Sequence, residues 1–303
     1  MAEAIGGRVG SMGVEGASIS ATGSQANGGV WLTPAYKNVD ADGFDAQGAS
    51  YGADVDLTGV TFGADTVNDN MRFGAAFNIG SGDADGKGQG NGLKDEFDYY
   101  GVGIYSVMGF GSLAVVGDAS FNVISHEVKG ASGSKDFGDV SAKADTTAVT
   151  LGVTGQYTIA TEFADITPHA GMRFTRLDTE SYEMKTAKGS IGKTDFDVQN
   201  VFSIPVGVGV SKAFNMGDWT LAPNADLTLT FNTGDTDVNS SVRFDGVKVN
   251  TVLDTEVLDK VTYGLNLGLG AQNGNFGTSV SINYTGSSNT DSLGINANAR
   301  FMF

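Results

Sequence analysis

The sequence predicts an all-β fold, namely a transmembrane, antiparallel, up-and-down β-barrel of twelve strands with a short N-terminal helix and linker in its lumen. Three observations predict this fold. Apolar side chains alternate with a period of two along most of the predicted strands. The positions between them carry Gly, Ser, Thr and Asn with few Lys or Glu, which is typical of a wet, uncharged lumen. Short and long connections alternate along the chain, as in transmembrane barrels.

The composition excludes several other classes of protein. The 303 residues include 45 Gly, 4 Pro and no Cys, and the formal net charge is −17. Gly is present at roughly twice its usual share, which does not suit a helical protein. The acidic balance argues against a nucleic-acid partner. The absence of Cys removes disulfides, thiolate metal sites and cysteine nucleophiles.

The sequence shows neither a membrane-spanning helix nor a signal peptide. It has no run of ~18 apolar residues. Its start, Met1 to Ala4, lacks the basic n-region and the apolar h-region of an export signal. The protein is therefore expected to be either cytosolic or a fragment whose export signal has been removed.

Residues 1–28 form the first predicted unit, a linker that plugs a pore. Ile5, Val9 and Met12 lie at helical spacing, although the Gly residues between them each weaken a helix by up to ~1 kcal/mol. Beyond Gly13 the segment is rich in Gly, Ser and Ala. We therefore expect a short, thin helix followed by coil, with side chains small enough for a narrow lumen.

Residues 29–303 form the second unit, the barrel. The alternation is clearest at the end of the chain, where Leu293, Ile295, Phe301 and Phe303 share one face and Arg300 lies on the other. It recurs in residues 73–79, 113–123, 149–159, 202–210, 219–231, 263–271 and 276–284, whereas the first two strands alternate poorly. The predicted strands are residues 29–39, 51–67, 71–83, 97–108, 112–127, 143–160, 163–183, 196–214, 219–233, 258–273, 275–286 and 290–303.

The connections and the aromatic residues complete the predicted architecture. Long polar loops are expected near residues 40–50, 83–96, 128–142, 184–196, 234–258 and 286–291, with short turns between them. Aromatic side chains near the short turns fit a membrane girdle, although strand propensity explains them nearly as well. These residues are Trp31, Phe163, Trp219 and Phe276.

Five charged residues fall on the polar face of their strands and are candidate pore-lining residues. They are Arg72, Asp118, Arg173, Asp226 and Arg300. One interpretation is a charged lumen that holds or guides a linker. The other is mutual ion pairing that stabilises the barrel, because buried charges must be paired in either case. The sequence leaves both interpretations open.

Several segments carry a resemblance to a known family. They are Val30-Trp31-Leu32-Thr33-Pro34, Phe44-Asp45-Ala46-Gln47-Gly48, Tyr51-Gly52-Ala53-Asp54, Thr167-Pro168-His169-Ala170-Gly171-Met172-Arg173-Phe174 and the C-terminal Asn296 to Phe303. With these segments and twelve strands, residues 29–303 resemble the translocator, or β-domain, of a classical monomeric autotransporter, the type V secretion unit of Gram-negative bacteria.

The resemblance implies a location and a mechanism. The barrel is expected in the lipid bilayer of the outer membrane, where it supports export of its own N-terminal passenger domain while the linker runs through the lumen. The barrel assembly machinery and periplasmic chaperones are the implied partners, and we expect a monomer. By the same resemblance, Leu293, Ile295, Phe301 and Phe303 form the assembly signal as well as facing lipid.

The sequence gives little support for metal binding or catalysis. The segment Asp83-Ala84-Asp85-Gly86 lacks the frame of a calcium loop, so the acidic stretches are interpreted as solvated loops. The residues two positions after His126 and His169 are Val128 and Gly171, not the Ser that an outer-membrane phospholipase barrel needs. We expect no catalytic residue, no cofactor and no metal. A porin or adhesin with functional extracellular loops, or a soluble all-β binding protein, remain the alternatives.

Overall fold

The computed structural model describes residues 28–46, 48–131, 138–246 and 250–303. Strands account for nearly all of these residues, and they pair antiparallel into one sheet that closes on itself. In these segments no helix is both long and apolar enough to cross a membrane. The predicted linker residues Ile5, Val9 and Met12 lie outside the described residues.

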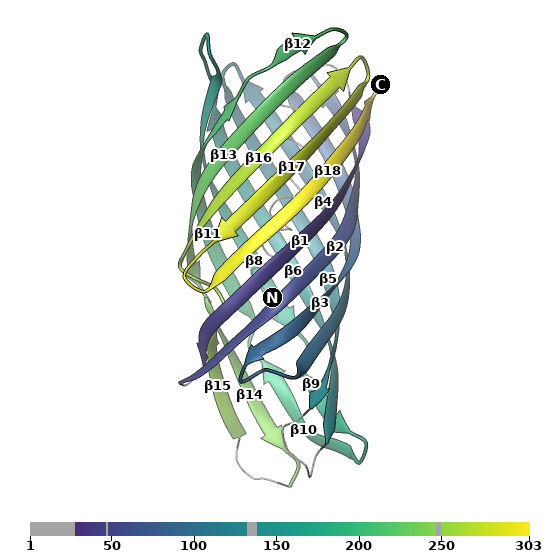
Figure 1. Ribbon diagram of the computed structural model, residues 1–303, viewed down its shortest axis with the longest axis vertical. Coiled ribbons are helices and arrows are strands. Elements are labelled where there is room, and N and C mark those ends of the chain that lie inside the picture. The colour runs from purple at the N-terminus through teal and green to yellow at the C-terminus, as the bar shows by residue number, and fades with distance from the viewer. Residues whose placement is uncertain (1–27, 47, 132–137, 247–249) are drawn as a thin grey trace.

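Twelve long strands form the wall of the barrel, so the predicted fold class is confirmed (Figure 1). They are β1 (Gly29–Ala46), β2 (Ala49–Asn68), β3 (Met71–Gly88), β4 (Leu93–Phe110), β5 (Leu113–Ala131), β6 (Asp139–Tyr157), β8 (Asp165–Thr179), β11 (Gln199–Ser211), β13 (Trp219–Gly234), β16 (Val261–Asn273), β17 (Phe276–Gly286) and β18 (Thr290–Met302). The shorter strands are β7 (Ile159–Ala160), β9 (Tyr182–Thr186), β10 (Gly189–Phe196), β12 (Phe214–Met216), β14 (Asp237–Phe244) and β15 (Asn250–Glu256).

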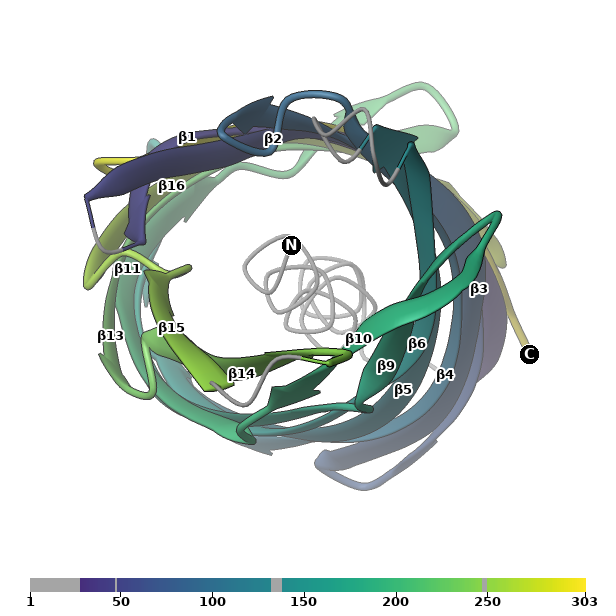
Figure 2. The ribbon, with the colours of Figure 1, turned by 90° about the horizontal axis from the view of Figure 1, so that it is seen from below.

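The barrel closes where its first and last strands pair. The register of β1 with β18 runs from Gly29 opposite Met302 to Ala41 opposite Thr290. The strands form a ring when the molecule is seen along the barrel (Figure 2). The short turns and the C-terminus lie at the top of Figure 1, here called the short-turn end, whereas the β9–β10 and β14–β15 hairpins extend below, at the long-hairpin end.

The long polar stretches are mostly strand, which corrects the prediction of long loops. β1 continues to Ala46 and β3 to Gly88, and the stretches around 184–196 and 234–258 form the β9–β10 and β14–β15 hairpins. Backbone pairing continues in register through charged residues such as Asp54 opposite Asp85. Apolar alternation ends where the lipid ends, because water solvates charged side chains, but backbone hydrogen bonding does not depend on lipid.

The polarity of the two faces reverses along a single strand. Towards the short-turn end of β2, Phe62 faces outward and is exposed, while the opposite face carries Gly and Thr. Beyond Thr58 the outward positions carry Asp54 and Asp56, and the inward positions carry Val55 and Leu57, which are buried. The reversal marks where the lipid-facing part of the wall gives way to a part built like a water-soluble protein.

Inward-facing apolar side chains form a cluster in this second part of the wall, here called the apolar inner cluster. It lies on seven neighbouring strands, from β1 to β8, roughly ten residues beyond the short turns. Its members are Val39, Val55, Leu57, Ala84, Phe97, Tyr99, Ile124, Ala148 and Leu177.

Candidate functional site

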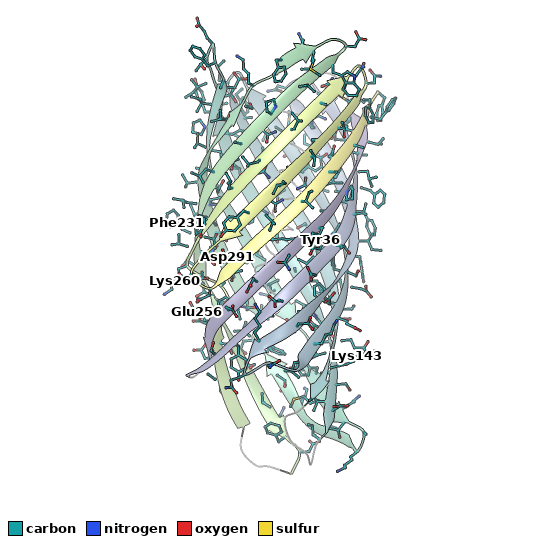
Figure 3. All side chains as sticks on the ribbon, in the orientation of Figure 1. Tyr36, Lys143, Phe231, Glu256, Lys260 and Asp291 are labelled. Carbon is teal, nitrogen blue, oxygen red and sulfur yellow. The ribbon has the colours of Figure 1, made fainter. Side chains whose placement is uncertain are left out.

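In the lipid-facing part of the barrel the outer face is apolar and the inner face is polar, as predicted from the alternation. On β18 every second residue is buried, and the buried set includes Ser292, Asn296, Asn298 and Arg300. The alternate positions are exposed. Phe231 projects outward from the wall in Figure 3, while the charged Lys143, Glu256 and Lys260 lie nearer the long-hairpin end. This arrangement fits a cylinder with hydrocarbon outside and water inside.

The predicted assembly-signal residues all lie on the outer face. The exposed fractions of Leu293, Ile295, Phe301 and Phe303 are 55%, 47%, 53% and 64%. Exposure of such large apolar groups is unfavourable in water, at about 25 cal/mol per Å². Their outward placement therefore requires contact with lipid or with a protein that replaces lipid during assembly.

A buried ionic cluster lies at the closing seam of the barrel. Arg72 on β3 donates from Nη1 to Asp65 Oδ1, and Arg300 on β18 donates from Nη2 to the same oxygen, both at 2.5 Å. Tyr105 on β4 donates from Oη to Asp65 Oδ2 at 2.7 Å. The Asp65 carboxylate has no exposed surface. This carboxylate thus ties the last strand to the second, third and fourth strands across β1.

Trp31 belongs to this cluster, which corrects its predicted place in an aromatic girdle. Its side chain is buried, its indole Nε1 donates to Tyr105 Oη at 3.0 Å, and it covers Gly63, where a Cβ would lie 2.1 Å from the indole ring. The weak alternation of the first strand concealed its orientation. Trp219, Phe163 and Phe276 are exposed near the short turns, as a girdle requires.

The other predicted lumen charges pair across an intervening strand. Arg173 on β8 donates two hydrogen bonds of 3.0 Å to Asp118 on β5, passing over Gly152 of β6. A Cβ at Gly152 would lie 2.7 Å from Asp118 Oδ1 and 2.8 Å from Arg173 Nη2. The pair therefore fits only because the strand between carries no side chain at this point.

His169 and Asp226 repeat this arrangement farther round the wall. His169 Nε2 on β8 lies 2.9 Å from Asp226 Oδ2 on β13, and the Thr228 hydroxyl donates to Asp226 Oδ1 at 2.7 Å. Gly207 of β11 lies between them, where a Cβ would be 2.6 Å from His169 Nε2. All five predicted lumen charges thus have a partner within the wall. The geometry favours mutual pairing over the interpretation in which these charges hold a linker.

Sequence reasoning identified both members of the Arg173–Asp118 pair but only some members of the other two groups. It missed Asp65 and Tyr105 as partners of the arginines, and it did not connect His169 with Asp226. Asp65 lies on the same face of β2 as Gly63 and Thr61, so the period of two contained the signal. Partners that lie two strands apart depend on the register between strands, which the period does not reveal.

Lys87, outside the lipid-facing part, is also paired. Lys87 on β3 donates to Asp40 on β1 and Asp54 on β2, both at 2.7 Å. Burial lowers the pKa of the Lys87 ammonium, but the hydrogen bonds to Asp40 and Asp54 outweigh it and raise that pKa above its usual range. Over the described ranges of the chain, no group of three or more His, Asp or Glu side chains is arranged to hold a metal ion.

One family model matches most of the chain. The model of the autotransporter beta-domain matches residues 30–285. A search of curated proteins finds no matching sequence. This family consists of transport domains associated with a passenger domain in the outer membrane.

Solved structures share the fold at low sequence identity. The translocator domain of autotransporter NalP from Neisseria meningitidis has a TM-score of 0.73 and 13% identity, and the match covers 100% of this chain and 98% of that chain. The transport unit of autotransporter AIDA-I from Escherichia coli has a TM-score of 0.66 and 11% identity, with 93% and 92% covered. The beta domain of the Bordetella autotransporter BrkA has a TM-score of 0.65 and 17% identity, with 92% and 100% covered.

The apolar outer face makes the alternative of a soluble all-β binding protein wrong. The family model and the solved autotransporter structures indicate the Gram-negative outer membrane as the location of the barrel. Because the family model spans most of the chain and the closed twelve-stranded wall agrees with it, this type V secretion barrel belongs to the autotransporter β-domain family.

Proposed function

We propose that this barrel exports a passenger polypeptide, joined ahead of residue 29, through the outer membrane to the cell surface. The observation that carries the proposal is the inside-out wall, apolar towards lipid and polar towards the lumen, that begins at the short-turn end. Gly29 lies opposite Met302 at this end, so a chain that precedes Gly29 reaches the lumen from the same side. Residues 1–28 are its linker.

The inner wall suits the passage of a polypeptide. Arg72 and Arg300 bind Asp65, and Arg173 binds Asp118. His169 contacts Asp226. Because these charges are engaged within the wall, they leave little field to trap a chain of either sign. Eight-stranded barrels have interiors filled by side chains, and barrels of 16 to 18 strands leave an aqueous channel. Twelve strands leave room for a helix or extended segments but not for a folded domain.

The exposed end of β18 serves as the recognition element for assembly in this proposal. Leu293, Ile295, Phe301 and Phe303 present an unbroken apolar row that the barrel assembly machinery binds after periplasmic chaperones deliver the chain. Replacement of Phe303 by Ala is expected to lower the yield of folded barrel in cells. It should leave refolding into detergent unchanged, because Phe303 lies at the end of the wall.

Surface display tests the export function. An export signal and an epitope-tagged passenger are fused ahead of residue 1, and the epitope is measured on intact cells by antibody binding and by its loss to external protease. The control carries the same signal and passenger without residues 29–303. We expect display only with the barrel. Equal display without the barrel, or none with a correctly inserted barrel, would overturn the proposal.

Single-channel current separates export from a passive porin. Removal of residues 1–28 is expected to raise the current markedly, because the linker plugs the lumen in the proposed function. An unchanged current would favour the porin or adhesin alternative, in which the hairpins carry the function.

A further inference from the structure

We propose that the apolar inner cluster is the docking wall for the linker, and that Ile5, Val9 and Met12 pack against it at the long-hairpin end of the lumen. The inference rests on the proposed function and adds to it where, and by which chemistry, the linker is held. It assigns this role to apolar packing, not to the charged residues of the lumen.

The first supporting observation is the reversal of polarity along the inner wall. Val55, Leu57 and Ile124 face inward and are 1%, 2% and 1% exposed, although the same face of the lipid-level wall is built from Gly, Ser, Thr and Asn. Burial of an aliphatic side chain contributes about 1.5–3 kcal/mol, and contact with a wet lumen would forfeit it. An apolar wall inside a barrel therefore predicts an apolar occupant.

The second observation is a row of buried amides directly beside the cluster. Asn78, Gly101 and Asn122 lie opposite one another on β3, β4 and β5. Both amide atoms of Asn122 and the Oδ1 atom of Asn78 are buried without a hydrogen-bond partner in the part of the chain that the structure describes. Buried polar groups are nearly always satisfied. The Gly-rich part of the linker offers bare backbone N–H and C=O groups of the kind these amides need.

The charged side chains of the lumen already have partners within the wall. Arg72 and Arg300 bind Asp65, and Arg173 binds Asp118 through two hydrogen bonds. To hold a linker carboxylate, these arginines would have to give up partners within the wall. The apolar inner cluster and the amide row carry no such cost.

The length of the linker matches the distance to the cluster. Val39 of the cluster is ten positions along β1 from Gly29, or about 33 Å along the strand and about 25 Å along the barrel axis at the usual tilt. Met12 precedes Gly28 by 16 positions. A flexible segment of that length spans about 22 Å, and a helix spans about 24 Å. Either conformation brings Met12 and Val9 to the level of the cluster.

Disulfide mapping tests the proposal, because the chain contains no native cysteine. In the full chain, Val9→Cys is combined with Leu57→Cys in the cluster. The matched control combines Val9→Cys with Thr61→Cys, four positions nearer the short-turn end on the same face of β2. Bridged cysteines need Cα atoms within about 7 Å. We expect an intramolecular disulfide with at least a several-fold higher yield for the Leu57 pair.

A higher yield for the Thr61 pair, equal yields, or a disulfide between two copies would overturn the proposal. A second variant leaves the wall untouched. Val9→Asp is expected to raise the single-channel current towards that of the barrel without residues 1–28, whereas Ser11→Asp, on the other side of the predicted helix, should not. Equal currents for both variants would also contradict it. Surface display that persists without the expected disulfide would reject the docking wall and leave the export function standing.

Discussion

Replacement of Asp65 by Asn tests the ionic cluster at the closing seam. The Asp65 carboxylate is fully buried and accepts hydrogen bonds from Arg72, Arg300 and Tyr105. An Asn side chain keeps the shape but removes the charge, so two buried guanidinium groups lose the carboxylate that they share. Loss of one partner from a buried ion pair costs about 3–5 kcal/mol.

This loss of stability is large compared with that caused by an exposed surface substitution. A loss of 3–5 kcal/mol lowers the folding equilibrium constant by about 150-fold to 5,000-fold. The control is Asp42→Asn, because the Asp42 side chain is 69% exposed and lies 3.7 Å from Lys87. We expect that control to change the free energy of unfolding by no more than about 0.5 kcal/mol.

Urea unfolding in lipid vesicles measures both variants. Trp31 lies in the cluster, so its fluorescence, measured in a Trp219→Phe background, reports on the seam. The double variant Asp65→Asn with Arg300→Gln should recover part of the loss, because one of the two unpaired charges is removed as well. A loss below about 1 kcal/mol for Asp65→Asn, or strict additivity in the double variant, would refute the role assigned to the cluster.

Three further predictions follow from other parts of the wall. Leu267→Lys, on the lipid face, should lower the free energy of unfolding in vesicles by about 2–4 kcal/mol, and its inward neighbour variant Asn266→Lys much less; the reverse order would contradict the orientation. Gly207→Ala places a Cβ 2.5 Å from the Leu227 carbonyl oxygen and should cost about 1–3 kcal/mol in the same assay, whereas Gly264→Ala, with its nearest atoms at 3.9 Å, should be neutral; equal effects would count against the pairing across Gly207. Hydrogen bonds from Lys193 and then Ser181 lower the pKa of Asp195 to about 2, so its contribution to the β9–β10 hairpin is present above its ordinary pKa of about 4 and is lost as pH falls towards 2. Hydrogen exchange of β10 should accelerate as the pH falls from about 4 to about 2, and Asp195→Asn should remove this pH dependence. An identical pH profile in the variant would reject the contribution assigned to Asp195.

The sequence predicts the barrel well because lipid imposes a simple rule. Lipid-level strands such as β16 and β18 alternate strictly, so the outward position of Leu267 and the inward position of Arg300 follow from the period of two. The rule stops at the edge of the membrane. Asp54 and Asp85 sit opposite each other in regular strands, yet their sequence is typical of solvated loops.

The lumen is harder to predict than the wall. The sequence identifies Arg72, Asp118 and Arg173 as inward residues, but whether they pair depends on strand register and on glycines such as Gly152 in the strand between. Trp31 shows the same limit. Its large apolar side chain favours lipid by residue type, whereas the pocket over Gly63 and the Tyr105 hydroxyl hold it inside.

The most direct test of the orientation of the wall is lipid quenching along β16. A fluorophore is attached to single cysteines placed in turn at positions 265 to 270, and quenching by brominated lipids is compared with quenching by a water-soluble reagent. Brominated lipids should quench at the outward positions Leu265, Leu267 and Leu269, and the aqueous reagent at Asn266, Gly268 and Gly270. Reversed quenching, or no alternation between neighbouring positions, would contradict an apolar exterior around a wet lumen.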